Sequence, residues 1–333
     1  MKVKLLIFSL LLLPSCLFAQ IETIVEKVNE QQAFPTEIPA GEYSGITHIA
    51  ADTFAVVSDK SHGHGFYLWK IHTAEHTGEI ISVKNLGYHG NGVGQFDIEG
   101  VAFNPRTHTI FISQEADNSI VELSRSGHLT GRKLLLPDSI TSHIRPNLGL
   151  ESLCYDKEKH LLWTATEGAI MTDGDVPTAT NGKETTVRLF AFNDSLHQVA
   201  WYKYKTDKPS DTKPARFYAL GVNDIAAIGN GLLLILEREA RVATNVIGSL
   251  TVIKVYLVNP HHAKIGSVLP KQLLMSYTTK FNFTRRDWAN FEGMCLTSPK
   301  ANGDRLLLFV ADSQSQYKGV LKDWLKTAII RQH

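Results

Sequence analysis

The apolar and polar residues of this chain repeat in short units. Three segments share the order apolar residue, glutamate, small residue, apolar residue: IEGVA at 98–102, LESLC at 150–154 and FEGMC at 291–295. Two further segments, 43–47 and 222–226, fit this motif with substitutions. In the second of them, a shift of one residue places Asp224 where the others have glutamate. Self-similarity of this kind is the sequence signature of a repeat architecture.

Each motif is followed by a turn and then by a strand-like run that ends in an acid. These second runs span residues 54–59, 109–115, 161–167, 232–237 and 306–312. A third run follows in most units, at 66–71, 119–123, 188–192 and 250–258. Short β-rich runs bounded by Gly, Asn, Asp and Pro, about four to a unit, are typical of the blades of a β-propeller.

The spacing of the units predicts the architecture. Unit starts at 44, 99, 151, 224 and 292 are separated by 55, 52, 73 and 68 residues, so some units must carry long loops, which we place at 168–187 and 206–221. We predict an all-β fold: a single propeller, five blades with six as the alternative, closed by N- and C-terminal segments. Residues 21–28 are the candidate closing strand beside the last blade. Helix is expected only in short connections and at 320–327.

The first residues have the pattern of a targeting segment. Lys2 and Lys4 precede an apolar run at 5–13, which is too short to span a bilayer, and a small residue, Ala19, follows. We predict a signal peptide over residues 1–19, cleaved after Ala19, and a propeller domain over 20–333. Lipid attachment at Cys16 is the alternative. The protein is thus expected to be exported, either periplasmic or secreted, with no transmembrane segment in the mature chain.

Charge and cysteine content narrow the possible partners. Without Lys2 and Lys4 the chain has 32 basic and 33 acidic residues, a balance that favours neither nucleic acid nor an anionic membrane as partner. Cys154 and Cys295 occupy the same place in two non-adjacent units, too far apart for a disulfide, so we expect buried, reduced thiols. The oligomeric state is not determined by the sequence, and a monomer is the default.

The recurring acids are the candidate functional residues. Because the first two strands of a blade are antiparallel, acids 16 residues apart, such as Glu99 and Glu115, return to the same mouth of the channel. The first acid set consists of Glu99, Glu151, Asp224 and Glu292, and the second of Asp59, Glu115, Glu167, Glu237 and Asp312. Carboxylates 5 to 6 Å apart repel by about 3 kcal/mol at an effective dielectric near 20, so a cation, arginines or protonation must compensate. The basic candidates are Lys60, Arg216, Arg238, Arg285 and Arg286.

Two interpretations of these acids stay open. They can accept hydrogen bonds from the backbone of the next blade, which is a structural role, or they can hold a divalent cation, with Ca²⁺ the first candidate because its ligands are oxygens. In the second case Glu115, Glu167 and Glu237 are the expected cation or ligand contacts, with Arg238 or Arg286 holding an anionic group. The pair His62 and His64 lacks further ligands nearby and is not expected to bind zinc. Neither a phosphate-binding glycine loop nor a serine-esterase motif is present.

The order of the motifs resembles a known family. Segments 96–102 (FDIEGVA), 149–153 (GLESL), 221–225 (GVNDI), 234–238 (LILER) and 290–293 (NFEG) are similar to those of the phytase-like domain family, which is also described as having esterase-like activity. The similarity runs from about residue 46 to 312. It implies hydrolysis of phosphate or carboxylate esters of a small anionic substrate, and it carries no settled catalytic residues. A histidine acid phosphatase is not implied, because 143–146 (HIRP) does not match its motif.

Two functions therefore remain in view. One is a metal-dependent ester hydrolase that uses the carboxylate-ringed channel mouth. The other is a non-catalytic propeller that binds a ligand, a glycan or a protein and whose acid ring is structural. The fold cannot separate them, since propellers serve both purposes.

Overall fold

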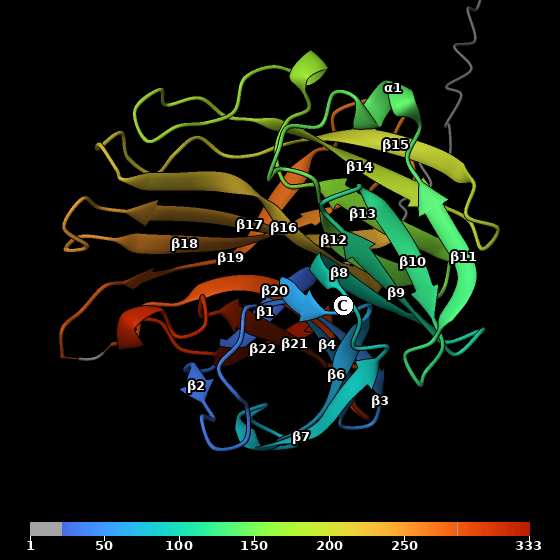
Figure 1. Ribbon diagram of the computed structural model, residues 1–333, viewed down its shortest axis with the longest axis horizontal. Coiled ribbons are helices and arrows are strands. Elements are labelled where there is room, and N and C mark those ends of the chain that lie inside the picture. Colours follow the sequence, from blue (N-terminus) through green and yellow to red (C-terminus); the bar gives the residue numbers. More distant parts are fainter. Residues whose placement is uncertain (1–21, 285) are drawn as a thin grey trace, which may run out of the picture.

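The computed structural model describes residues 22–284 and 286–333, and these form five antiparallel sheets arranged as the blades of a propeller (Figure 1). The predicted signal peptide over 1–19, Cys16 and Arg285 lie outside the described residues. The prediction of an all-β propeller with five blades is confirmed. Within the described residues, helix is limited to α1 (Asp138–Thr141) and two 3₁₀ turns, η1 (Met171–Asp173) and η2 (Tyr317–Gly319). None of these helices is long or apolar enough to cross a membrane.

Every blade has a set of four strands, of which the first lies nearest the axis, and blades 2 and 5 each have one additional short strand. Blade 1 contains β3 (Tyr43–Ala50), β4 (Thr53–Ser58), β6 (Gly65–Thr73) and β7 (Ile80–Gly90). Blade 2 contains β8 (Gln95–Asn104), β9 (Thr109–Gln114), β10 (Ser119–Leu123) and β11 (Leu129–Leu135), and β5 (Lys60–His62) pairs with β8. Blade 3 contains β12 (Leu150–Asp156), β13 (Leu161–Thr166), β14 (Thr186–Phe192) and β15 (Gln198–Lys205). The predicted second and third runs are therefore the second and third strands.

Blade 4 has the longest inner strands and extends to the left in Figure 1. It contains β16 (Phe217–Gly229), β17 (Leu232–Val242), β18 (Leu250–Val258) and β19 (Lys271–Lys280). Blade 5 contains β20 (Asn290–Leu296), β21 (Arg305–Asp312), β22 (Trp324–Gln332) and β1 (Thr23–Val28), with β2 (Gln32–Ala33) also paired to β22. The loop predicted over 168–187 lies between β13 and β14 apart from its last two residues, which belong to β14. The loop predicted over 206–221 ends earlier, because β16 begins at Phe217.

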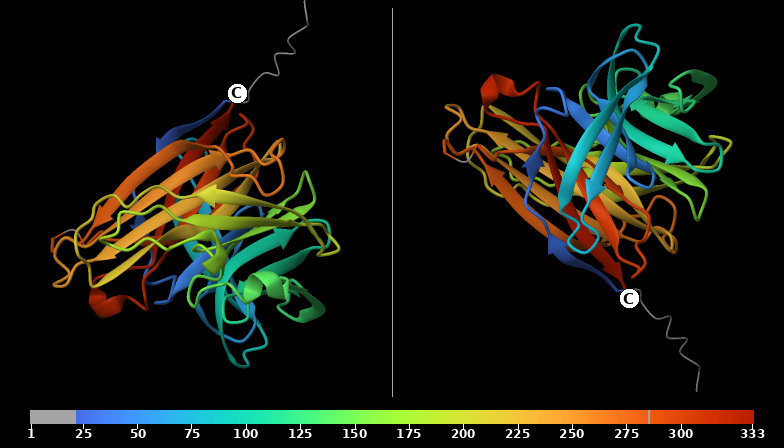
Figure 2. Two further views of the ribbon diagram at one scale, coloured as in Figure 1. Left: turned by 90° about the horizontal axis from the view of Figure 1, so that it is seen from above. Right: turned by 90° about the horizontal axis from the view of Figure 1, so that it is seen from below.

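The two ends of the chain close the ring. β1 pairs antiparallel with β22 from Thr23 opposite Gln332 to Val28 opposite Ala328, and Figure 2 shows the two strands side by side near the C-terminus. This confirms the predicted closing strand and covers an edge of the last blade. The helix predicted at 320–327 is wrong. Residues 324–330 are all buried in β22, where pairing with β1 and β21 outweighs local helix propensity.

The first strands pack around the axis in the cyclic order β3, β8, β12, β16, β20 and back to β3. Apolar clusters fill the spaces between neighbouring blades. Phe291 and Phe309, for example, pack with Leu236 and Leu257 between blades 4 and 5. The core is therefore a set of interblade layers, and the axis itself is lined by the first strands.

A bulge recurs where each first strand begins to approach the axis. In every blade one extra residue interrupts the pairing with the second strand, between 43 and 45, 98 and 101, 150 and 152, 222 and 224, and 291 and 293. The next residue is glycine in three blades. A Cβ on Gly45 would lie 2.6 Å from the Glu99 carbonyl oxygen, and one on Gly100 would lie 2.7 Å from that of Glu151. Glycine recurs here because neighbouring backbones leave no room for a side chain.

Cys154 and Cys295 are free, the first half-buried and the second buried. They lie on β12 and β20, the first strands of blades 3 and 5, with β16 between them. The prediction of two thiols that form no disulfide is confirmed. Burial raises the pKa of both thiols, which keeps them protonated.

The close approach at the glycines predicts a measurable cost for one methyl group. Gly100→Ala should lower the free energy of unfolding by about 3 kcal/mol, because the added Cβ meets fixed backbone as well as Leu153. Ser152→Ala, at the equivalent place in blade 3, is the control. It removes the hydrogen bond that the Ala165 amide donates to the Ser152 hydroxyl oxygen and should cost about 1 kcal/mol. Urea unfolding of both variants measures the difference, and equal costs would contradict the packing argument.

Candidate functional site

Ten side chains from the five blades surround one mouth of the channel. Strand register identifies five of them, the first-strand ring, as the bulged residues Ser44, Glu99, Glu151, Asn223 and Glu292. The residue before each bulge pairs with a residue of the second strand, and the residue that follows this partner in the sequence belongs to the second-strand ring. The five residues of this ring are Asp59, Glu115, Glu167, Arg238 and Asp312. Seven of the ten are carboxylic acids, and one is an arginine. Most acids predicted at this mouth are thus placed there.

Blade 4 departs from the predicted alignment at both positions. Val222 pairs with Glu237, and Asp224 pairs with Leu236, so Asn223 and not Asp224 occupies the glutamate position. By the same register Arg238 and not Glu237 is equivalent to Glu115 and Glu167. The prediction that Asp224 takes the glutamate position of the motif is therefore wrong by one residue. The apolar spacing of three, seen in Val222 to Ile225 as in Ile98 to Val101, was the signal that could have shown this.

Three carboxylates of blades 2 and 3 come closest together. One ligand atom each from Glu99, Glu115 and Glu151 lies within 4.8 Å of the other two. Glu99 is on β8, Glu115 directly follows β9, and Glu151 is on β12. Oxygen atoms at this spacing are suited to a hard divalent cation. We call these three residues the acid cluster.

Burial and mutual repulsion raise the pKa of the first-strand glutamates. The pKa values of Glu99 and Glu151 are well above the usual range, mainly because the groups are buried and further because other carboxylates are close. Burial raises the pKa of Glu292 to about 8, although Arg238 opposes the shift. The pKa of Glu115 is raised by burial in the same way.

Two acids of the second-strand ring titrate in a lower range. Burial raises the pKa of Asp59 to about 6, with Lys60 opposing and Asp97 adding to the shift. Burial likewise raises the pKa of Asp312 to about 6, against hydrogen bonds from Gln314. Without a bound cation the mouth can thus hold protons near neutral pH.

Arg238 is the central cation of this layer. Its guanidinium donates to Glu167 Oε1 at 2.9 Å, to Glu292 and to Asn290 Oδ1 at 3.1 Å. It therefore bridges blades 3, 4 and 5. Within residues 22–284 and 286–333, Arg238 and Lys60 are the two cations that form ion pairs with the ten mouth residues.

Some of the predicted acids have structural roles. Asp224 is buried and accepts hydrogen bonds from the Met294 amide at 2.7 Å and the Ile225 amide at 2.8 Å, so it joins blade 4 to blade 5. Burial raises its pKa despite these bonds. Glu115 accepts a hydrogen bond from the Gly149 amide at 2.9 Å, which links blade 2 to blade 3. The structural interpretation therefore describes Asp224 fully and Glu115 in part.

Glu237 is not brought to the acid cluster. Its carboxylate accepts from the Tyr204 hydroxyl at 2.5 Å and the Asp207 amide at 3.1 Å, and it pairs with Lys271 at 2.5 Å. Lys254 and Lys271 also pair with Asp207. This group lies between blades 3 and 4, and it is compensated by its own lysines.

The other basic candidates are peripheral. Arg286 and Arg216 are exposed, on the β19–β20 and β15–β16 connections. Lys60 pairs with Glu42 at 2.5 Å and with Asp59 at 3.7 Å, so it neutralises one edge of the mouth. His64 contacts Gln114 at 3.0 Å, and His62 is exposed on β5.

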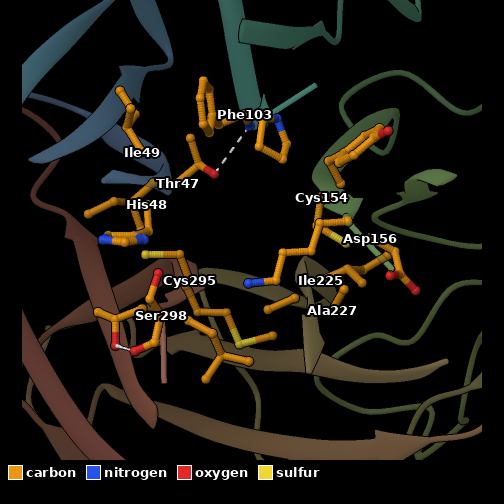
Figure 3. Close-up of a pocket in the computed structure, with 18 of the residues that line it drawn as sticks. Thr47, His48, Ile49, Phe103, Cys154, Asp156, Ile225, Ala227, Cys295 and Ser298 are labelled. Carbon is orange, nitrogen blue, oxygen red and sulfur yellow. Dashed lines mark hydrogen bonds between the residues drawn. The ribbon is translucent and has the colours of Figure 1, made fainter. Parts of the chain in front are cut away.

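A cavity of about 200 Å³ lies at the opposite end of the first strands. All five first strands line it, and Figure 3 shows Cys154 and Cys295 on different walls, with Asp156 on the side of Cys154 and His48 on the side of Cys295. His48 bonds to the Ala51 carbonyl at 2.9 Å, and burial lowers its pKa. Aliphatic residues and the two thiols share its lining with charged residues of both signs, among them Asp156, Lys157 and Arg305.

We expect the cation-free protein to lose stability as pH rises from about 4 to about 8. Asp59, Asp312 and Glu292 have raised pKa values when folded, of about 6, 6 and 8, against about 4 when unfolded. The folded state therefore binds more protons, and the resulting stability is complete below pH 4 and is lost as pH passes the folded values.

Thermal unfolding in chelator should show a fall in Tm of about 5 °C or more between pH 5 and pH 8. Asp59→Asn, which resembles the protonated form, should make the decrease shallower between pH 4 and pH 6. A Tm that is constant or rises over this range would contradict the assignment.

Comparison with known proteins supports a family assignment but no named relative. No curated protein sequence matches the chain. Among solved structures, a luciferin-regenerating enzyme is similar at a TM-score of 0.43 and 9% identity, over 93% of this chain and 95% of that one. A DUF4221 family member from Bacteroides vulgatus is similar at 0.39 and 9%, over 94% and 98%. Kuenenia stuttgartiensis hydrazine synthase gives 0.37 and 8%, over 83% of this chain and 57% of that one. At these values the structures carry no argument about function.

A family model described as "Esterase-like activity of phytase" matches residues 38–314. The match covers all five first strands and both rings of the mouth. The chain belongs to the phytase-like family.

Proposed function

We propose that this protein binds a divalent cation, with Ca²⁺ the first candidate, at the acid cluster and uses it to hydrolyse small anionic esters, phosphate esters above all. The observation that carries the proposal is the convergence of Glu99, Glu115 and Glu151, whose ligand atoms lie within 4.8 Å of one another. The description of the family as esterase-like supports the choice of reaction.

Charge balance is the physical reason for a cation. Two carboxylates about 5 Å apart repel by about 3 kcal/mol at an effective dielectric near 20. Arg238 offsets the charges of Glu167 and Glu292 but forms no ion pair with the acid cluster among the described residues. An oxygen-coordinated divalent ion supplies the missing positive charge and displaces the protons that otherwise occupy the cluster.

In this proposal, some residues of the mouth bind the cation and another transfers a proton. Glu99, Glu115 and Glu151 hold the cation, which when bound neutralises and polarises an anionic ester. Arg238 keeps Glu167 and Glu292 in place beside it. Asp59 is half-buried, and its pKa of about 6 suits a group that accepts a proton from the attacking water at neutral pH. The proton that Asp59 has accepted then passes to the leaving alkoxide as the ester bond breaks.

A non-catalytic binding propeller is the second candidate, and one observation favours it. Arg238 is only 7% exposed and is bonded to two carboxylates, so it is not free to hold a phosphate group. Arg286 is on an exposed connection between β19 and β20. Under this alternative the cation is bound for stability or for contact with a ligand, and no ester is cleaved.

Metal analysis and an ester assay test the proposal. Purified protein should contain a stoichiometric divalent metal, and hydrolysis of a phosphomonoester should cease in chelator and return with Ca²⁺. Glu151→Gln should weaken Ca²⁺ binding at least tenfold, because it removes a charged ligand, and should reduce hydrolysis in proportion. Glu75→Gln, at an exposed site away from the mouth, is the matched control.

The two functions give different outcomes. Bound metal without hydrolysis of phosphate or carboxylate esters would support the binding propeller. Absence of metal binding, together with a Tm that Glu151→Gln lowers and Ca²⁺ does not change, would show that the acid ring is structural.

A further inference from the structure

The first-strand ring contains a buried amide without partners. Asn223 is 3% exposed, and neither its Oδ1 nor its Nδ2 has a hydrogen-bond partner among the described residues. Buried polar groups in native proteins are almost always hydrogen-bonded, so an exception calls for an explanation such as an ion. Two buried amide atoms without hydrogen bonds lower the stability of the folded protein. A residue with a purely structural role at this position would not carry that cost.

Strand register brings this amide to the acids. Asn223 occupies the same bulge on β16 that Glu151 and Glu292 occupy on β12 and β20, the two strands that flank β16 around the axis. Glu99 and Glu292 each contribute to the raised pKa of Glu151, in keeping with the shared position of the three residues on strands that line one axis. Arg238, the other mouth residue of blade 4, reaches both Glu167 and Glu292.

We propose that Asn223 is a neutral ligand of the cation site, with Oδ1 bound to the cation and Nδ2 donating to a neighbouring carboxylate. This inference rests on the proposed function, because it needs a cation at the mouth. Amide oxygens are regular ligands of Ca²⁺, and they add coordination without adding negative charge. A fourth glutamate at this position would add repulsion to a ring that already contains Glu99, Glu151 and Glu292.

An ion fits this place better than an organic ligand. The side chain is almost fully buried within the ring, so a single-atom ligand reaches it more readily than an ester does. The bound cation would pair Oδ1 and would orient the amide so that Nδ2 meets a carboxylate oxygen. Both unsatisfied atoms would then be accounted for by one binding event.

The test compares Asn223→Ala and Asn223→Asp with wild type and with Asn245→Ala, a control on the exposed turn between β17 and β18. Calorimetric titration with Ca²⁺ gives the affinity, and thermal unfolding is measured in chelator and in Ca²⁺. For Asn223→Ala we expect at least tenfold weaker binding and a smaller Ca²⁺-dependent rise in Tm, with a Tm in chelator equal to or above that of wild type. Asn223→Asp should retain Ca²⁺ binding but unfold at a lower temperature in chelator, because it adds a carboxylate.

Each outcome decides between the claims. If wild type binds Ca²⁺ and Asn223→Ala binds it equally well, the role of Asn223 is refuted while the proposed function stands. Loss of binding in Asn223→Asp also refutes it, because that variant keeps an oxygen ligand. If wild type binds no divalent cation, the proposed function fails and this inference fails with it. If Asn223→Ala does not fold, the amide is a structural requirement and the inference is refuted.

Discussion

The organisation of this protein depends on how closely five backbones approach one axis. Where the first strands bulge inward, the space that a Cβ at Gly45 or Gly100 would need is taken by the carbonyl oxygen of the next blade. The side chain just before this constriction has to face the channel, and in three blades it is a glutamate. Close backbone packing thus forces like charges together, and the electrostatics of the mouth follow from the geometry of the ring.

Blade 4 changes the charge balance of this ring. In the first-strand ring, blade 4 has Asn223 where blades 2, 3 and 5 have glutamate. In the second-strand ring, it has Arg238 where the other blades have an acid. The displaced acids acquire other partners: Asp224 binds backbone amides, and Glu237 pairs with Lys271. The mouth is therefore asymmetric, with an acid-rich side from blades 2 and 3 and an amide and guanidinium on the side of blade 4. In a uniform structural ring every blade would supply the same bond, so the asymmetry supports the proposed cation site.

Protons, Arg238 and, in the proposed function, a divalent cation neutralise the carboxylates of the mouth. Burial raises the pKa values of Glu99, Glu151 and Glu292, so protons serve when nothing else is bound. Arg238 offsets one part of the ring permanently. What remains is the group formed by Glu99, Glu115 and Glu151, which a divalent ion can neutralise without protonation. Stability and pH are consequently linked at the place in the molecule where the proposed cation would bind.

The sequence by itself determined the repeat and the closure of the ring and favoured five blades over six, because apolar spacing and turn residues act locally and recur in every unit. It also placed Glu99, Glu115, Glu151 and Glu167 at one mouth, since strand length decides where antiparallel strands return. Only the tertiary structure decided the register of blade 4. A one-residue bulge changes which side chain faces the axis, and the sequence carried one indication of Asn223, the apolar spacing from Val222 to Ile225. The strand at 324–332 was decided in the same way, because a partner 300 residues away pairs with it.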